Sequence, residues 1–332
     1  MTHHDLPAGL PRAAAGRAEH RLRSYARLGK LDVFDYYLSI LVVLAAVLLP
    51  AARFDRPTAT MLVVFLLGQV FVIMAMVALD DVTGFRDGSD TQNYGPDNPL
   101  RNKLRKPLVA GTLTERQALQ FAWVTALVGA VLWAVAAYAA PHRPTWALVL
   151  IAALFVVSLQ YSYGLKISYH GFQEAFLVAL GVVLVVAPYG LAAGHFSGFL
   201  LVQGVLFGFG PLMFGVYSNT NDVEGDRAVG RPTVAALVSE RGNAVFIGCL
   251  SAAEFLLGAV ASATGIAPWW FVLLMLPATA LRTKQFITGF VRGDIMRARK
   301  TGFAVHRLSV ALLVVANLLV GSGLLVGAGA AV

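Results

Sequence analysis

Apolar residues in this chain of 332 residues fall in runs close to twenty residues long, and polar or basic segments separate the runs. A helix needs about twenty such residues to cross roughly 30 Å of hydrocarbon. We therefore predict nine membrane-spanning helices, at residues 34–52, 59–79, 117–140, 146–161, 172–194, 198–217, 244–264, 267–281 and 303–329. The pattern indicates an all-α polytopic membrane protein, with a basic tail at 1–30 followed by a transmembrane domain at 31–332.

The composition supports this class and excludes others. Hydrophobic residues make up 58% of the chain and charged residues 13%, which is about half the charged fraction of a soluble domain. The mean hydropathy is +0.69, so a water-soluble globule is excluded. The single cysteine, Cys249, excludes an intramolecular disulfide and a metal site built from several cysteines.

Basic residues are distributed unevenly across the predicted membrane. The net charge of +8 could suggest a nucleic-acid partner. However, only three of the 26 basic residues, Arg53, Arg56 and Arg143, fall on one side, and the other 23 fall in or beside the tail and loops of the opposite side. By the positive-inside rule we expect a cytoplasmic N-terminus, cytoplasmic long loops and an outside C-terminus, in a cytoplasmic membrane of the bacterial type. The charge therefore indicates orientation, and nucleic acid is not expected as a partner.

Seven of the 18 acidic residues gather in two loops, 79–95 and 217–233, each directly after a predicted span. These acids are Asp80, Asp81, Asp87, Asp90, Asp222, Glu224 and Asp226. Acids at a membrane edge are costly unless they pair or bind cations. If helix continues into the loops, Asp80 and Asp87 share a face, as do Asp222 and Asp226. Oxygen ligands without histidine or cysteine favour Mg²⁺; the alternative is that they are solvated loop acids that attract basic neighbours.

Basic residues accompany both acidic loops. They are Arg101, Lys103, Arg105 and Lys106 after the first loop, Lys166 in a short loop between the two, and Arg227 and Arg231 after Asp226. Cations beside metal-binding carboxylates suit a diphosphate, whose charge exceeds what one Mg²⁺ neutralises. The alternative is that these residues are the positive charge of any cytoplasmic loop.

The second acidic loop fits the pattern N-x-x-D-x-x-x-D-R followed by Gly-Arg/Lys-x-Thr. The matching residues are Asn219, Asp222, Asp226, Arg227, Gly230, Arg231 and Thr233. Together with the first loop, this resembles the UbiA-type intramembrane prenyltransferase superfamily over roughly residues 34–300.

The first loop resembles the branch that prenylates dihydroxynaphthoate, in which N-D-x-x-D is followed by G-x-D-T. The residues that match this branch are Asp81, Gly88, Asp90 and Thr91. The residues similar to the family's R-P-L-x-x-G segment and tyrosine-containing loop are Lys106, Pro107, Leu108, Gly111, Tyr161, Ser162, Lys166, Gly171 and Glu174. The chain departs from the pattern where Asp80 replaces an Asn and Gly84 replaces a metal-binding Asp. We expect Asp87, one helical turn onward, to take the place of the missing acid.

The resemblance implies one helical bundle around a central cavity that opens near the cytoplasmic face. It implies Mg²⁺-dependent transfer of an isoprenoid from a prenyl diphosphate to an aromatic acceptor, phenolic or naphthoate-like, at a site surrounded by membrane lipid. The implied metal ligands are Asp80, Asp81, Asp87, Asp90, Asn219, Asp222 and Asp226. The implied diphosphate-binding residues are Arg105, Lys106, Tyr161, Lys166, Asn219, Arg227 and Arg231. The catalytic set is Asp81, Asp87, Asp222, Asp226, Lys166 and Glu174, with Glu174 or Asp81 as general base.

Two other functions fit part of the pattern. A terpene cyclase of the same superfamily would use the same Mg²⁺ site without an acceptor. A transporter would place its polar residues near the middle of the membrane in broken helices, whereas these acids lie at span ends. In either prenyl reaction the allyl cation needs aromatic faces, and candidates flank the loops at Tyr161, Tyr163, Phe214 and Tyr217.

Overall fold

The computed structural model describes residues 21–49, 55–94 and 102–323, and these residues form helices without any strand. This confirms the predicted all-α class. Six helices are long and apolar enough to cross a membrane by length and composition: α3 (Arg56–Arg86), α5 (Glu115–Ala139), α7 (Gln173–Ala193), α8 (Gly198–Asn221), α11 (Glu240–Ala263) and α13 (Ile295–Ser322). Three shorter helices overlap the remaining predicted spans: α2 (Ser39–Leu48), α6 (Thr145–Leu159) and α12 (Phe271–Phe286).

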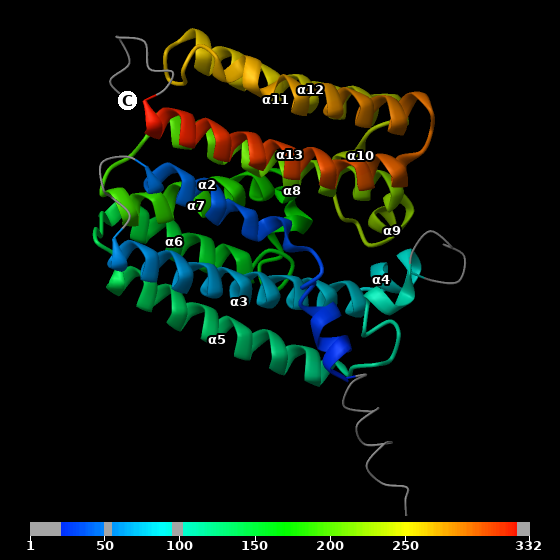
Figure 1. Cartoon of the computed structure of the whole chain (residues 1–332). Coiled ribbons are helices and arrows are strands. Elements are labelled where there is room, and N and C mark those ends of the chain that lie inside the picture. The colour runs from blue at the N-terminus through cyan, green and yellow to red at the C-terminus, as the bar shows by residue number, and fades with distance from the viewer. Residues whose placement is uncertain (1–20, 50–54, 95–101, 324–332) are drawn as a thin grey trace, which may run out of the picture.

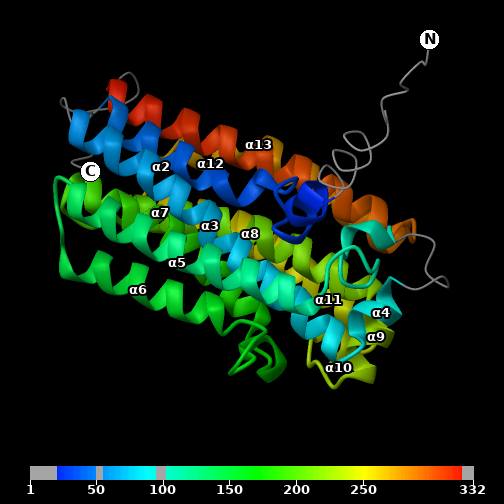
Figure 2. The ribbon, with the colours of Figure 1, turned by 90° about the horizontal axis from the view of Figure 1, so that it is seen from below.

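Short helical elements connect the long helices. They are a helix over 21–28, η1 (Phe34–Leu38), α4 (Ser89–Asn93), η3 (Lys103–Arg105), η4 (Ile167–His170), α9 (Val223–Ala228), α10 (Val234–Leu237) and the π-helical η5 (Ile287–Val291). Figures 1 and 2 show α4, α9 and α10 together at one end of the bundle. The described chain begins at this end, at residue 21, and finishes at the opposite end, at residue 323 (Figure 1).

The long helices pack side by side along most of their length. The most extensive contacts join α3 to α5, α7 to α8 and α13 to α8, with α11 and α12 forming a further pair (Figure 1). Glycines allow close approach: a Cβ built on Gly181 of α7 would lie 2.3 Å from the Cα of Gly208 on α8. Small residues at helix contacts are the usual device in a bilayer, where lipid competes equally well for apolar side chains.

Local sequence sets where these helices begin. The side chain of Asp55 accepts a hydrogen bond from Thr58 N at the start of α3, and Thr114 and Gln117 form a capping box at the start of α5. Such caps satisfy backbone N–H groups that have no partner within the helix. The caps thus set the residues at which α3 and α5 begin.

Two sets of polar side chains inside the bundle pair with one another across helices. Arg282 of α12 donates from Nε and Nη2 to Glu254 of α11 at 2.6 and 3.0 Å, and from Nη1 to Gln285 Oε1 at 2.6 Å. Gln203 of α8 and Asn317 of α13 exchange hydrogen bonds at 2.7 and 2.8 Å. Unpaired polar groups are expensive in hydrocarbon, so these pairs fix how α8, α11, α12 and α13 dock.

Candidate active site

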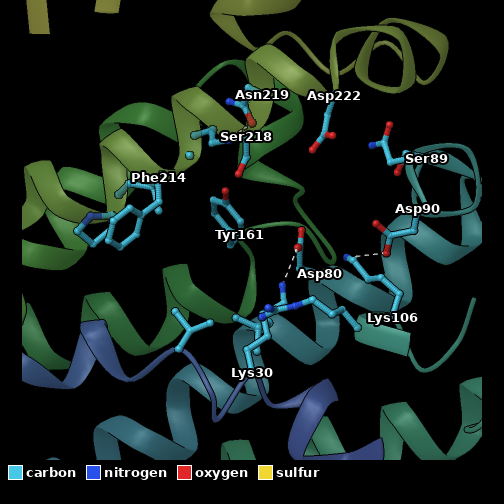
Figure 3. A pocket seen from close by; sticks show the side chains of 18 of the residues that line it. Lys30, Asp80, Ser89, Asp90, Lys106, Tyr161, Phe214, Ser218, Asn219 and Asp222 are labelled. Carbon is cyan, nitrogen blue, oxygen red and sulfur yellow. Dashed lines mark hydrogen bonds and ion pairs between the residues drawn. The ribbon is translucent and has the colours of Figure 1, made fainter. Parts of the chain in front are cut away.

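A cavity of about 240 Å³ opens where the C-terminal ends of α3 and α8 meet the short helices α4 and α9. Its polar lining residues are Lys30, Tyr36, Asp80, Ser89, Asp90, Asn93, Tyr94, Arg105, Lys106, Tyr161, Gln173, Ser218, Asn219, Asp222, Asp226, Arg231 and Arg299. Figure 3 shows Asn219 and Asp222 on one wall and Asp80 and Asp90 on the other. The two acidic loops that the sequence singled out are thus brought together across one cavity.

The first acidic loop supplies Asp80, Asp81 and Asp90, and Lys106 connects the last two. Lys106 Nζ lies 2.8 Å from Asp81 Oδ1 and 2.7 Å from Asp90 Oδ2. Although burial alone would lower it, these two carboxylates raise the pKa of Lys106. Burial raises the pKa of the Asp90 carboxyl to about 6 against the opposing effect of Lys106. Asp81 is 1% exposed and is not among the lining residues, so it lies behind Lys106 rather than at the cavity surface.

The carboxylate of Asp90 occupies the space beside Gly84. A Cβ built on Gly84 would lie 2.8 Å from Asp90 Cγ and Oδ2 and 3.1 Å from Oδ1. Helix α3 ends at Arg86, and Gly88 adopts a left-handed conformation with φ 85°. This turn, which glycine adopts without penalty, folds α4 back so that Asp90 approaches Gly84.

Asp87 faces a different set of partners. Its Oδ1 accepts hydrogen bonds from Ser89 N at 3.0 Å and Ser89 Oγ at 2.8 Å, and its Oδ2 accepts a short one from the hydroxyl of Tyr169. Asp87 does not line the cavity. The structure therefore brings together Asp80 and Asp90, and not Asp80 and Asp87, on the first-loop wall.

The second acidic loop supplies the opposite wall. Asn219 Oδ1 accepts from Gln173 Nε2 at 3.1 Å, Asp222 Oδ1 accepts from Asn221 Nδ2 at 3.0 Å, and Asp226 Oδ2 accepts from Thr233 Oγ1 at 3.1 Å. Burial raises the pKa of Asp226 to about 6. A nearby cation stabilises the ionised form of a buried carboxyl. A metal ion or a basic ligand would therefore bind favourably beside Asp226.

Arg231 links the two walls. Its Nη2 lies 3.5 Å from Asp80 Oδ1 and donates to Ser168 Oγ at 3.2 Å, and its guanidinium lies 5.1 Å from the centre of the Tyr169 ring. The lining residue Tyr161 is buried and its ring centre lies 4.6 Å from that of Phe176. Figure 3 shows Tyr161 between the acidic walls.

Other predicted site residues lie around the cavity in different ways. Arg105 lines it and pairs with Asp32 at 2.8 Å. Lys166 is exposed, Glu174 is half-buried, and neither lines the cavity. Arg227 is exposed and donates from Nε to the carbonyl of Ala236 at 2.9 Å, away from the lining.

Sequence reasoning did not single out Lys30, Gln173, Ser218 or Arg299, which all line the cavity. Lys30 stands in a basic tail and Arg299 in a basic loop, where positive charge is expected from topology alone. Ser218 directly precedes Asn219, and Gln173 directly precedes Glu174. Adjacency to a motif residue was therefore the feature of the sequence that could have identified them.

The donor set of the cavity fits Mg²⁺. The lining holds four carboxylates, two asparagine side chains and no histidine or cysteine. Among the described residues, no three acidic, histidine or cysteine side chains lie close enough together to hold a metal ion by themselves. This is compatible with Mg²⁺, which binds through one or two carboxylates and fills its other positions with water and substrate phosphates.

The UbiA prenyltransferase family model matches residues 39–305, which contain both acidic loops and most of the cavity lining. The chain belongs to the UbiA prenyltransferase family. The expectation that the protein is a prenyltransferase is thereby confirmed. No curated protein matches the chain.

Solved structures of UbiA homologues share the fold. One from Aeropyrum pernix K1, without ligand, has a TM-score of 0.62 at 17% identity. The match covers 84% of this chain and 97% of the Aeropyrum pernix chain. One from Archaeoglobus fulgidus, bound to DMAPP and Mg²⁺, has a TM-score of 0.59 at 14% identity and covers 87% and 99%. A digeranylgeranylglyceryl phosphate synthase has a TM-score of 0.57 at 14% identity and covers 90% and 99%. The Archaeoglobus fulgidus homologue was also solved with GPP and Mg²⁺, so the predicted Mg²⁺ cofactor is confirmed for the UbiA family.

Proposed function

We propose that this UbiA-family protein transfers an isoprenoid chain from a prenyl diphosphate to an aromatic acceptor, phenolic or naphthoate-like, with Mg²⁺ as cofactor. The observation that carries the proposal is the single cavity in which the carboxylates of α3–α4 face those of α8–α9, with Lys106 and Arg231 beside them. A diphosphate with its Mg²⁺ matches this mixture of acidic and basic groups.

The residues that would hold Mg²⁺ are Asp80, Asp90, Asn219, Asp222 and Asp226, all of which line the cavity. When bound there, Mg²⁺ would neutralise the diphosphate and act as a Lewis acid for its departure. We propose that Asp90, rather than Asp87, supplies the acid that is missing at Gly84, because its carboxylate fills that space. Asp87 would instead accept the hydrogen bond from the Tyr169 hydroxyl and so orient the Tyr169 ring. The guanidinium of Arg231 lies over a face of that ring.

Lys106 and Arg231 would donate to the phosphate oxygens. Both side chains lie at the cavity, and each is oriented by a carboxylate of the first loop. Asp81 would act by holding Lys106 from behind. Negative charge grows on the diphosphate as the C–O bond breaks, so fixed cations stabilise that transition state more than the ground state. Arg105 would add a further positive charge at the rim.

The apolar part of the cavity would hold the isoprenoid. Met76, Leu177, Phe214 and Phe303 line it, and the rings of Phe214 and Phe303 stack with centres 4.3 Å apart. Figure 3 shows Phe214 well away from the acids. Aromatic faces stabilise an allyl cation, and an apolar lining keeps water from capturing it. A ring carbon of the acceptor would form the new C–C bond, diphosphate would leave, and the released diphosphate would take up the ring proton.

We further propose that nine helices span the membrane and that the cavity opens to the cytoplasmic side. The 23 basic residues on or beside that side support the orientation through the positive-inside rule. The N-terminus would then be cytoplasmic and the C-terminus outside, in a bacterial-type cytoplasmic membrane. The first loop resembles the branch that prenylates dihydroxynaphthoate, which makes a naphthoate the first acceptor to test.

The experiment is an incubation of purified protein with geranyl, farnesyl or geranylgeranyl diphosphate, each with and without dihydroxynaphthoate or a simple phenol. We expect prenylated acceptor and diphosphate in equal amounts, with Mg²⁺ and not in excess EDTA. Cyclic hydrocarbon formed from prenyl diphosphate alone would reject the transferase and support a terpene cyclase. Asp222→Asn provides the inactive control.

A further inference from the structure

Lys30 reaches the cavity from a helix that lies outside the family match, which begins at residue 39. Residues 21–28 form this helix, and Leu28 at its end is fully buried. The ring of Tyr25 stacks on Phe121 of α5 with centres 5.3 Å apart. These contacts dock the helix on the bundle, so the turn that follows it is held beside the cavity.

The helix ends in a Schellman turn with Lys30 at the left-handed position. Leu31 N donates to Ala26 O at 3.0 Å, Lys30 N donates to Arg27 O at 3.1 Å, and the φ of Lys30 is 48°. Glycine normally occupies this position, because a Cβ makes the left-handed conformation costly. A lysine here sacrifices stability, and a strained residue beside a candidate site points to a role for its side chain.

The ammonium of Lys30 contacts the first acidic loop beside two other cations, Lys106 and Arg231. Lys30 Nζ lies 3.3 Å from Asp81 Oδ1 and 3.8 Å from Asp80 Oδ2. Figure 3 shows Lys30 beside Asp80. Lys106 already holds the same Asp81 oxygen at 2.8 Å, and Arg231 already pairs with Asp80. The side chain of Lys30 is 30% exposed, against 9% for Lys106. Its charge is therefore the more open of the two to an incoming anion.

We propose that Lys30 is a diphosphate-binding residue that the N-terminal helix contributes to the cavity. Its ammonium donates to a phosphate oxygen of the prenyl diphosphate, while Lys106 stays on Asp81 and Asp90. No covalent bond forms or breaks at Lys30. This inference rests on the proposed function, because it assigns a further binding residue for the same substrate.

The test uses Lys30→Gly, which removes the charge and relieves the backbone strain. The full-length protein is titrated with geranyl thiodiphosphate, a slowly ionising analogue, and separately with geraniol, at saturating Mg²⁺ and constant ionic strength. We expect Kd for the thiodiphosphate to rise about tenfold or more, as when a charge-assisted hydrogen bond is lost. Kd for geraniol should not change, and the melting temperature should be equal or higher.

Two further variants complete the experiment. Lys30→Arg keeps the charge and should bind the thiodiphosphate within about threefold of the unmodified protein. Lys103→Ala removes an exposed lysine that does not line the cavity, and should leave both Kd values unchanged. If Lys30→Gly leaves Kd for the thiodiphosphate unchanged, or raises Kd for geraniol by the same factor, the proposed role of Lys30 is wrong. The proposed function is not affected by either result. Failure of the unmodified protein to bind the thiodiphosphate overturns the proposed function as well.

Discussion

Replacing Gly84 with alanine should damage the site while leaving the fold intact. A Cβ at this position would lie 2.8 Å from Asp90 Cγ, whereas carbon atoms in contact are separated by about 3.5 Å or more. The Asp90 carboxylate must therefore move by roughly 0.7 Å. It is buried and holds Lys106 at 2.7 Å, so this shift would lengthen that ion pair and misplace both groups.

The magnitude follows from this displacement. A misplacement near 1 Å in a catalytic constellation can cost about 100-fold in rate, so we expect kcat/KM to fall by roughly 10- to 100-fold, or about 1.4 to 2.7 kcal/mol of transition-state stabilisation. Alanine favours helix over glycine by about 1 kcal/mol, and position 84 lies within α3. Thermal stability should thus be kept while activity falls, which separates this effect from unfolding.

The assay is Mg²⁺-dependent release of diphosphate, with melting temperature measured in parallel. If Asp87 supplied the missing acid, Asp87→Ala would be the more damaging change and Gly84→Ala would be tolerated. That order of activities would refute the assignment of Asp90. A positive control moves the acid: Gly84→Asp combined with Asp90→Ala should be more active than Asp90→Ala alone.

Three other predictions concern the second wall, the helix packing and pH. Asp222→Asn or Asp226→Asn should lower turnover by at least about 100-fold, which is comparable to the loss in excess EDTA. The melting temperature should not change. If either variant is as active as the unmodified protein, the assignment of these residues as metal ligands is wrong. Gly181→Ala should destabilise the protein by about 1–3 kcal/mol, because its Cβ meets Gly208 at 2.3 Å, and a denaturation midpoint equal to that of the unmodified protein would contradict the close packing. Without Mg²⁺, stability should fall as pH rises through the range from about 4 to about 6, because burial raises the pKa of Asp226 to about 6 and the folded state then binds the proton more tightly than the unfolded state. Because burial raises the pKa of Asp90 to about 6 as well, Asp226→Asn should reduce this pH dependence without abolishing it, which thermal denaturation in EDTA would measure.

Much of the fold was accessible from the sequence because the bilayer imposes a length on each apolar run. Each of the nine runs overlaps a helix, although α2, α6 and α12 are shorter than the six helices that are long and apolar enough to span a membrane. The meeting of the two acidic loops was also predictable. Loops that follow even-numbered spans lie on the same side of the membrane, so their acids can share one cavity.

The details of the first loop were not accessible, because they depend on where a helix stops. Extending α3 by periodicity placed Asp87 on the face of Asp80. The helix instead ends at Arg86, and the left-handed Gly88 turns the chain so that Asp90 reaches Gly84. No hydrophobic pattern records such a turn.

Basic residues were hard to assign for a different reason. Positive charge on cytoplasmic loops is expected from topology, so it hides the few cations that enter a site. Lys166 and Arg227 match family motifs yet are exposed, whereas Lys30 and Arg299 match none and line the cavity. Only the packing of the N-terminal helix and of α13 against the other helices distinguishes them.

The central claim is that diphosphate and Mg²⁺ bind between the two acidic walls. The most direct measurement is a structure of the protein with geranyl thiodiphosphate and Mn²⁺ in place of Mg²⁺, in which anomalous scattering locates the metal. We predict metal within the cavity, in contact with carboxylates from both walls, including Asp90 and Asp226, and with the diphosphate between Lys106 and Arg231. Metal and diphosphate bound elsewhere, with these carboxylates uncoordinated, would contradict the account.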